Sequence, residues 1–408
     1  MPTIRIRNIG PIVDTGEISI SPIMLIVGKQ SSGKSTFMKI LCFCRWIEKK
    51  IMTDGENLLT KYTHYNRFFK ELKSFHRLDD AFFNANSSIL YNGDCIDIEL
   101  TSSKKNVKIR KKPNFKSERY NSKLCFIPSE RNLATAIQNI DRVYRSADYD
   151  SVFNYLLEYQ EAKKNYYAKH AINMPFDKDV SFYYDVANDT DRIVLRKANK
   201  EISPIFASSG IQSALPLTVL VDYTINQIGR MPKSSVKDIT NLVAKVLLDN
   251  PQKEHDDISI DDIAKASKMI RYKFSQLYIE ELEENLFPVS QFELIKLIIQ
   301  FIVDAQRKAG VPSYVVMTTH SPYVLTSLNA IMKLSVAASK NPEACKDMQQ
   351  YIAPIEWFSA YCMTETGTME DIVDHDDAFI SGDYLDSLSD KISSMESDLN
   401  EIIYGSED

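Results

Sequence analysis

The chain has 408 residues, of which 44% are hydrophobic and 25% are charged, as in ordinary globular proteins. This composition excludes a fibrous or wholly disordered protein, and the length allows one large domain with insertions or two domains. The formal net charge of −6 gives no general attraction to a polyanion, although a local basic surface stays possible.

The cysteines and the N-terminus indicate a cytoplasmic protein. The six cysteines lie singly or as one C-x-C pair beside apolar runs, without the spacing of a zinc site, so we expect reduced thiols in the core. The first residues lack the apolar region of a signal peptide, and no apolar run approaches the ~20 residues that span a bilayer. We therefore expect no membrane contact.

Residues 23–36 have the pattern of a phosphate-binding loop. An apolar run at residues 23–27 predicts a buried strand, and G-x-x-x-x-G-K-[ST] follows it directly with a match at every specified position. The glycines let backbone N–H groups converge on phosphate oxygens, the lysine adds a charge, and the hydroxyl after it can bind Mg²⁺. The residues expected to bind phosphate are Gly28, Gln30, Ser31, Ser32, Gly33, Lys34, Ser35 and Thr36. ATPases, GTPases and kinases all use this loop.

Residues 94–112 contain two alternating runs and predict a β-hairpin with a basic second strand. Its basic residues and those that follow could track a nucleic-acid backbone, or they could form a solvated outer strand face. Both interpretations stay open. The residues concerned are Lys104, Lys105, Lys108, Arg110, Lys111, Lys112, Lys116 and Arg119.

Charged residues follow two further predicted strands. Glu280 and Glu281 come directly after the apolar residues 277–279, and His320 comes after the predicted strand at residues 313–319. In a doubly wound sheet such strand ends face the ligand crevice. Two adjacent carboxylates repel each other unless a divalent cation and a reacting water take one each, so we expect one of the two to face a metal and the other a water.

Residues 133–200 and 229–274 are charged and rich in helix-like sequence, and we interpret them as two helical insertions. Between them, Ser209 and Gly210 precede an apolar segment that runs toward Tyr223. A serine and a glycine at a helix start form an end that can bind an anion.

Together these segments resemble the ATP-binding-cassette ATPases of the OLD and SMC/Rad50-like branch. The resemblance rests on the phosphate loop, a serine-serine-glycine signature at residues 208–213, the double glutamate with its continuation at residues 280–288, and a histidine motif at residues 318–322. Residues 127–132 are similar to the proline-x-glutamate-arginine segment of the family. The motifs cover residues 1–330 in the family order.

The resemblance implies an α/β fold, an ABC-type ATPase head with a mixed sheet plus a helical insertion. The ATPase domain would consist of residues 1–132, 201–228 and 275–373, interrupted by the insertions at 133–200 and 229–274 and followed by a tail at 374–408. It further implies ATP and Mg²⁺ as cofactors, and a homodimer or higher homo-oligomer with ATP at the interface.

The resemblance also assigns roles to individual residues. Ser35 and Glu280 would bind Mg²⁺, Glu281 would polarise the attacking water, and His320 would sense the γ-phosphate. Ser209 and Gly210 would contact ATP bound to the partner subunit. The sequence departs from the family pattern twice, because Glu280 replaces the usual aspartate and Leu282 a common proline.

The tail, residues 374–408, is acidic and amphipathic. One apolar stripe at helical spacing predicts contact either with the ATPase body or with a helix of a partner. Its members are Leu385, Leu388, Ile392, Met395, Leu399 and Ile402. The resemblance implies a nucleotide-driven switch or sensor with a separate effector protein, of the kind found in bacterial anti-phage systems such as the PARIS type. The alternative is a DNA-repair or chromosome-maintenance ATPase that clamps nucleic acid.

Overall fold

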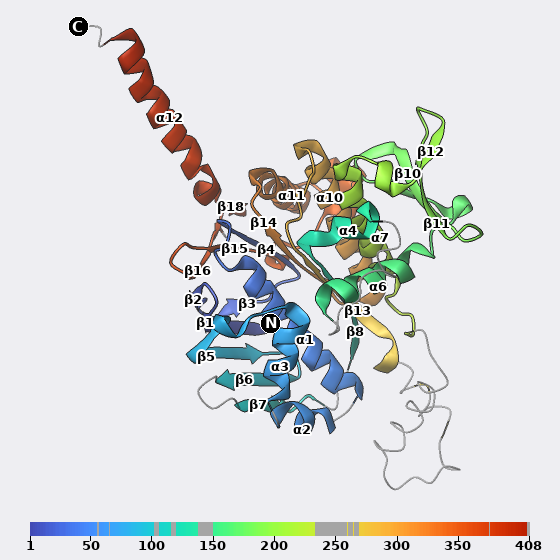
Figure 1. The fold of residues 1–408 in the computed structure, drawn as a ribbon, viewed down its shortest axis with the longest axis vertical. Coiled ribbons are helices and arrows are strands. Elements are labelled where there is room, and N and C mark those ends of the chain that lie inside the picture. Colours follow the sequence, from blue (N-terminus) through green and yellow to red (C-terminus); the bar gives the residue numbers. More distant parts are fainter. Residues whose placement is uncertain are drawn as a thin grey trace.

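The computed structural model describes residues 1–405 apart from 55–56, 65, 102–105, 116–119, 138–149, 233–258, 260–263, 265–268 and 375. A six-stranded mixed sheet forms its centre (Figure 1). In spatial order its strands are β16 (Met369–Asp371), β15 (Phe358–Met363), β4 (Ile23–Gly28), β14 (Tyr314–Thr319), β13 (Tyr272–Ile279) and β8 (Asn121–Ile127). Only β16 runs antiparallel to its neighbour. The predicted α/β class with a mixed sheet is confirmed.

The central strand β4 separates two hydrophobic cores. Ile23, Leu25 and Val27 belong to one core, whereas Met24 and Ile26 belong to the other. Successive side chains of a strand point to opposite faces, so a strand buried on both faces reads as one continuous apolar run. All six cysteines are buried and free, as predicted.

Helices cover both faces of this sheet. The first core includes residues of α6 (Ser151–Lys163), α7 (Ser209–Asn226), α10 (Pro288–Ala309) and α11 (Pro322–Lys340). The second core includes residues of α1 (Lys34–Asp54), α2 (Asn57–Thr63) and α3 (Arg67–His76). Both faces of the sheet are therefore covered by helices. The ends of its strands remain as the place for a binding site.

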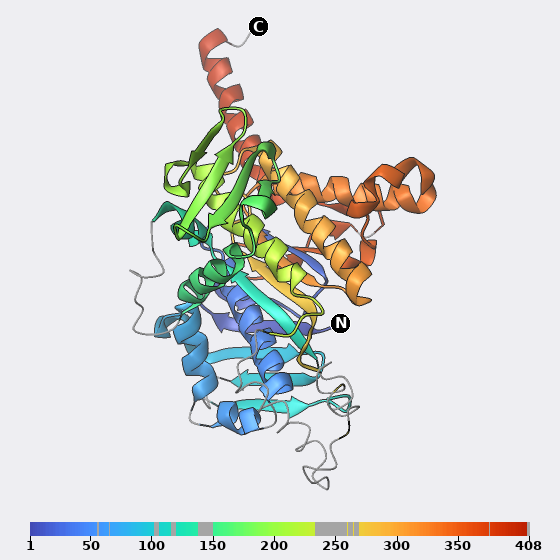
Figure 2. The same cartoon turned by 90° about the vertical axis from the view of Figure 1, so that its right-hand side faces the viewer.

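An antiparallel sheet packs beyond α1 in the second core and lies in the lower part of the molecule in Figure 2. The predicted hairpin is confirmed within it, because β6 and β7 pair antiparallel with Leu100 opposite Val107. Lys104, Lys105, Lys116 and Arg119 lie outside the described residues. The strands are β1 (Thr3–Ile9), β2 (Ile12–Asp14), β3 (Ile18–Ser19), β5 (Phe83–Asn92), β6 (Ile96–Thr101) and β7 (Asn106–Lys111).

The helical interpretation of residues 133–200 is wrong for its second half. After α6 the chain forms a four-stranded antiparallel sheet of β9 (Ile172–Met174), β10 (Asp177–Asp185), β11 (Thr190–Leu195) and β12 (Lys200–Ile202). Asp189 and Asn199 take left-handed backbone conformations, φ 50° and 49°, in the turns between β10 and β11 and between β11 and β12. Aromatic residues such as Phe182 and Tyr184 suit strands as well as helices, so composition alone did not decide.

Residues 233–258, most of the insertion expected at 229–274, lie outside the described part of the chain. The tail forms α12 (Asp383–Tyr404), which projects from the body in both views (Figure 1, Figure 2). Along the described residues, no helix combines the length and apolar character required to cross a membrane.

One buried histidine stands out in the second core. His76, the last residue of α3, is fully buried against the rings of Phe43, Phe75 and Phe126. Burial, aided by the positive charge of Lys39 on α1, lowers the pKa of His76 to about 3. The imidazole is therefore neutral in the folded protein at neutral pH.

We expect replacement of this histidine by phenylalanine, an aromatic ring that cannot be protonated, to make folding less sensitive to acid. Between pH 6.5 and about 3 the unfolded chain binds a proton at His76 and the folded chain does not. The free energy of unfolding therefore decreases as the pH is lowered through this window. This group contributes at most about 1.4 kcal/mol per pH unit to the decrease. Urea unfolding at pH 7 and pH 5 should show the advantage of His76→Phe over the wild type growing at pH 5. An advantage that stays constant contradicts the neutral assignment.

Candidate functional site

The parallel strands bring the predicted site residues to one edge of the central sheet. β4 ends at Gly28 and leads into the phosphate loop, β13 ends at Ile279 before Glu280, and β14 ends at Thr319 before His320. Because these neighbouring strands run parallel, their carboxyl ends lie side by side.

The phosphate loop has the backbone that its glycines were expected to allow. Gly28 has φ 145°, and a Cβ atom built there would lie 2.5 Å from the carbonyl oxygen of Met363 on β15. Ser31 has φ 61° at the tip of the loop. Gln30 and Ser31 are exposed, whereas the Ser32 Oγ is buried and has no hydrogen-bond partner among the described residues. The loop thus places a buried hydroxyl, without a partner among the described residues, next to the exposed Gln30 and Ser31.

Lys34 points back into this loop. Its Nζ donates to the carbonyl oxygens of Gly28 and Lys29, each at 2.7 Å, and lies 3.5 Å from the Nδ1 atom of His320. Burial lowers the pKa of Lys34 to about 8, although the charges of Glu281 and Glu283 oppose this shift. Ser35 and Thr36 follow it in the first turn of α1, Ser35 half-buried and Thr36 buried.

Glu280 is a buried carboxylate next to the start of α1. One oxygen accepts from the backbone N–H of Ser129 at 3.4 Å, and the other has no hydrogen-bond partner in the described chain, with the Lys39 Nζ 3.8 Å away. Burial raises the pKa of Glu280, whereas the positive charge of Lys39 and the nearby Ser35 hydroxyl lower it. Glu280 and Ser35, the predicted metal ligands, are therefore brought together.

Glu281 faces solvent beside His320. Its Oε1 lies 3.7 Å from the Nε2 of His320, and its backbone takes a left-handed conformation with φ 44°. The Glu281 N–H donates to the Thr318 side chain at 3.0 Å. Glu283 accepts from the Thr319 hydroxyl at 2.7 Å and from the His320 N–H. The loop after β13 is thus tied to the end of β14.

The sequence did not assign a role to Arg131, which holds this loop from the other side. The guanidinium is fully buried and donates to the carbonyl oxygens of Glu280, at 2.7 Å, and Glu281, at 2.8 Å. It also lies 3.4 Å from the Glu284 carboxylate. Arg131 follows a buried strand and carries five N–H donors, and this was the only signal for its role.

The signature helix contacts the same loop. Ser213 of α7 donates to the Glu284 carboxylate at 3.1 Å, and a Cβ atom on Gly210 would lie 3.0 Å from the carbonyl oxygen of Asn285. Ser209, the first residue of α7, is exposed. The signature therefore packs on the loop that carries Glu281 in its own subunit, and the neighbours of Gly210 within 4 Å of an added Cβ atom are Asn285 and Leu286 of that loop.

These residues suit a nucleoside triphosphate with Mg²⁺. The helix N-terminus and Lys34 offer positive charge to phosphate, and the Ser32 hydroxyl lacks a partner among the described residues. The buried oxygen of Glu280 likewise lacks one, close to the Ser35 hydroxyl, and hard oxygen donors are the ligands of Mg²⁺.

Comparisons with known proteins leave the family open. No protein-family model and no curated protein matches the chain. An SMC head domain from Thermotoga maritima is 10% identical over 80% of this chain and 90% of its own, with a TM-score of 0.35. An Smc head domain with an extended coiled coil, bound to the C-terminal domain of ScpA, from Pyrococcus furiosus, is 8% identical over 97% and 99%, with a TM-score of 0.38. A bacterial ABC transporter cassette solved as a dimer is 9% identical over 90% and 98%, with a TM-score of 0.28.

We expect Arg131→Met to destabilise the loop that carries Glu281. The substitution leaves two backbone carbonyls and a carboxylate without their buried donor, which costs about 3–5 kcal/mol. Hydrogen exchange should show faster exchange at the amides of Glu281 and Leu282, and urea unfolding should show the loss of stability. Arg307→Met is the matched control, because Arg307 pairs with Asp304 on an exposed surface and should lose about 1 kcal/mol or less. Equal losses in the two variants would contradict the role of Arg131.

Proposed function

We propose that the chain binds and hydrolyses ATP at the carboxyl edge of the central sheet and acts as a nucleotide-driven switch. One observation carries the proposal. His320 lies between Lys34 of the phosphate loop, 3.5 Å from Nδ1, and Glu281, 3.7 Å from Nε2. A phosphate-binding lysine and a solvent-facing carboxylate are thereby joined through one imidazole.

The proposed chemistry follows from this arrangement. Lys34 and the loop N–H groups bind the phosphates, and Ser35 and Glu280 hold Mg²⁺, which neutralises phosphate charge. Glu281 is exposed to water and polarises the attacking molecule, while His320 contacts the γ-phosphate and keeps Glu281 in place. Arg131 and Thr318 fix the backbone at Glu281, so the carboxylate is positioned without reorganisation.

Exposed apolar residues around the site support a head-to-tail homodimer or higher homo-oligomer. Phe206 precedes α7 and is 76% exposed, Phe287 follows the Glu281 loop and is 72% exposed, and Tyr323 begins α11 after His320 and is also exposed. Large apolar side chains gathered at one edge are typical of an interaction surface. In the proposed assembly Ser209 and Gly210 contact ATP held by the partner.

The helix α12 supports a separate effector protein. Its described apolar residues are exposed, including Met395 at 63% and Ile402 at 79%, and acidic residues lie between them. This favours contact with a partner over packing on the ATPase body. The role in bacterial anti-phage defence, including the PARIS type, is proposed from the sequence resemblance alone.

Nucleic-acid clamping is the second candidate, and the hairpin gives it little support. Lys108 and Arg110 lie 3.3 and 3.7 Å from the Glu99 carboxylate, and Lys112 lies 3.6 Å from Asp97. These basic side chains of β7 and of the residue after it are paired with carboxylates of β6, so the described hairpin offers little net positive charge to a phosphate backbone.

We expect Lys34→Ala to lower ATP affinity by about 100-fold or more, because it removes charge-assisted bonds to phosphate. Equilibrium dialysis with labelled ATP measures this effect. Lys29→Ala is the control on the same loop, since the exposed Lys29 pairs with Glu365, and it should bind ATP normally. Normal binding by Lys34→Ala would remove the phosphate-loop assignment.

Glu281→Gln should keep ATP binding and slow hydrolysis by about 10²–10⁴-fold, because the amide cannot polarise water as the carboxylate does. Phosphate release under single-turnover conditions is the measurement. Glu365→Gln changes the same charge at an exposed position and should hydrolyse normally. If Glu281→Gln hydrolyses ATP at the wild-type rate, Glu281 is not the residue that activates water.

Ser209→Arg should block ATP-dependent dimerisation and leave ATP binding to the monomer intact. Ser209 is exposed in the single subunit, so the larger side chain should clash only with a partner's nucleotide. Light scattering of the hydrolysis-deficient Glu281→Gln protein with and without ATP tests this. Ser339→Arg adds the same charge on exposed α11 and should dimerise normally. Unchanged dimer yield with Ser209→Arg would refute the signature assignment.

A further inference from the structure

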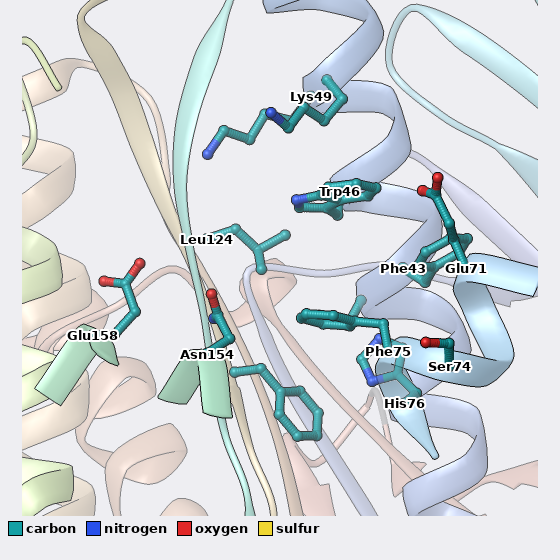
Figure 3. Close-up of a pocket in the computed structure, with 13 residues that line it drawn as sticks. Phe43, Trp46, Lys49, Glu71, Ser74, Phe75, His76, Leu124, Asn154 and Glu158 are labelled. Atoms are coloured by element: carbon teal, nitrogen blue, oxygen red, sulfur yellow. The ribbon is translucent and has the colours of Figure 1, made fainter. Parts of the chain in front are cut away.

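A cavity of about 480 Å³ lies far from the phosphate loop, between α1, α3, β8 and α6 (Figure 3). We call it the distal cavity. Its volume falls in the range of small-molecule sites, ~300–1,000 Å³. Trp46 lies twelve residues beyond Lys34 on α1, or about 18 Å along the helix at 1.5 Å per residue. The distal cavity is therefore separate from the site proposed for ATP.

Aromatic rings form much of its wall. Phe43 and Trp46 project from α1, Phe75 from α3 and Phe126 from β8. Phe43 and Trp46 stack with their centroids 5.7 Å apart, and Trp46 and Phe75 point toward the same space in Figure 3. Aromatic faces and edges favour a planar ring as occupant.

His76 adds polar groups to this aromatic wall. The side chain lines the cavity and is fully buried, and neither ring nitrogen has a hydrogen-bond partner among the described residues. A neutral imidazole has one donor and one acceptor, and leaving both unpaired in the interior is unfavourable. A ligand that carries a donor or an acceptor on its edge would satisfy one of the two nitrogens.

Charged side chains of both signs line the cavity. Lys49 and Lys50 contribute two positive charges and Glu71 and Glu158 two negative charges, while Asn154 offers a neutral amide. Glu158 also accepts from Lys123 at 2.5 Å, and Glu71 lies 3.5 Å from Lys61, so each carboxylate has a lysine partner outside the lining and does not require a cationic ligand. Such a rim favours a ligand whose ring system is uncharged.

We propose that the distal cavity binds a nucleobase, presented as a free base, a nucleoside or a nucleotide. Nucleobases are planar and uncharged, and they carry hydrogen-bond donors and acceptors on their edges. The aromatic wall contacts the faces of the base, His76 pairs with its edge, and the carboxylates of the rim, which already have lysine partners, do not require a charged ring.

Tryptophan fluorescence tests the proposal directly. The chain has two tryptophans, so Trp357→Phe leaves Trp46 of the cavity wall as the reporter. Adenosine, guanosine, cytidine and uridine are titrated without ATP, in a Lys34→Ala background that removes the phosphate-binding lysine. We expect a saturable change with at least one nucleoside. No change with any of them, up to their solubility limits, overturns the proposal.

Variants locate the binding. His76→Phe should weaken binding of the responding nucleoside by about tenfold, because one hydrogen bond is lost. The melting temperature of this variant should stay equal to or above that of the parent protein. Phe75→Leu, which keeps His76 and the Trp46 reporter, should also weaken binding of this nucleoside. His170→Phe replaces an exposed histidine and should bind normally. Unchanged affinity in both His76→Phe and Phe75→Leu overturns the assignment of the site.

Related ligands distinguish the sources of the base. The free base, the nucleoside and the 5′-monophosphate are compared by calorimetry in the same protein. Equal affinity for all three shows that the base alone is recognised, and tighter binding of the monophosphate shows that Lys49 or Lys50 contacts phosphate in addition. Because these titrations use protein without Lys34, the absence of nucleoside binding would not contradict the proposed ATP site. The absence of ATP binding in the wild-type protein would likewise not contradict nucleoside binding in the distal cavity.

Discussion

The site depends on the parallel pairing of β8, β13, β14 and β4. In a parallel sheet every strand delivers its carboxyl end to the same edge, so the loops after these strands meet although the sequence separates them by up to about 290 residues. The burial of β4 on both faces fixes its position in the middle of the sheet. Gly28, Glu280 and His320 are neighbours because the strands before them are.

Backbone geometry alone does not position the carboxylates, because the loop after β13 takes an unfavourable path. Glu281 and Asn285 both have positive φ, which costs on the order of 1 kcal/mol or more for residues with side chains. Arg131 offsets this with its buried bonds to the Glu280 and Glu281 carbonyls, and Thr318 holds the Glu281 N–H. The strain is concentrated where the chemistry is proposed, as expected of a functional loop.

Much of this site could be predicted because its signals are local. The phosphate loop follows from spacing within nine residues, and Glu280, Glu281 and His320 each follow an apolar strand. The function of Arg131 could not be predicted, since its partners are backbone carbonyls about 150 positions away. The strands at residues 172–202 were mistaken for helix because tyrosine and charged residues suit both structures, and only the pairing of β10 with β11 decides between them.

Two elements link the proposed ATP site with the distal cavity. α1 begins with Lys34 at the phosphate loop and lines the cavity through Phe43 and Trp46, and β8 lines it through Phe126 before leading to Arg131. An occupant that shifted either element would change the position of the Glu281 loop through Arg131, and ATP binding would act on the cavity by the same route. Because coupling between two ligands is reciprocal, a base bound in the cavity alters ATP affinity only as far as ATP alters affinity for the base.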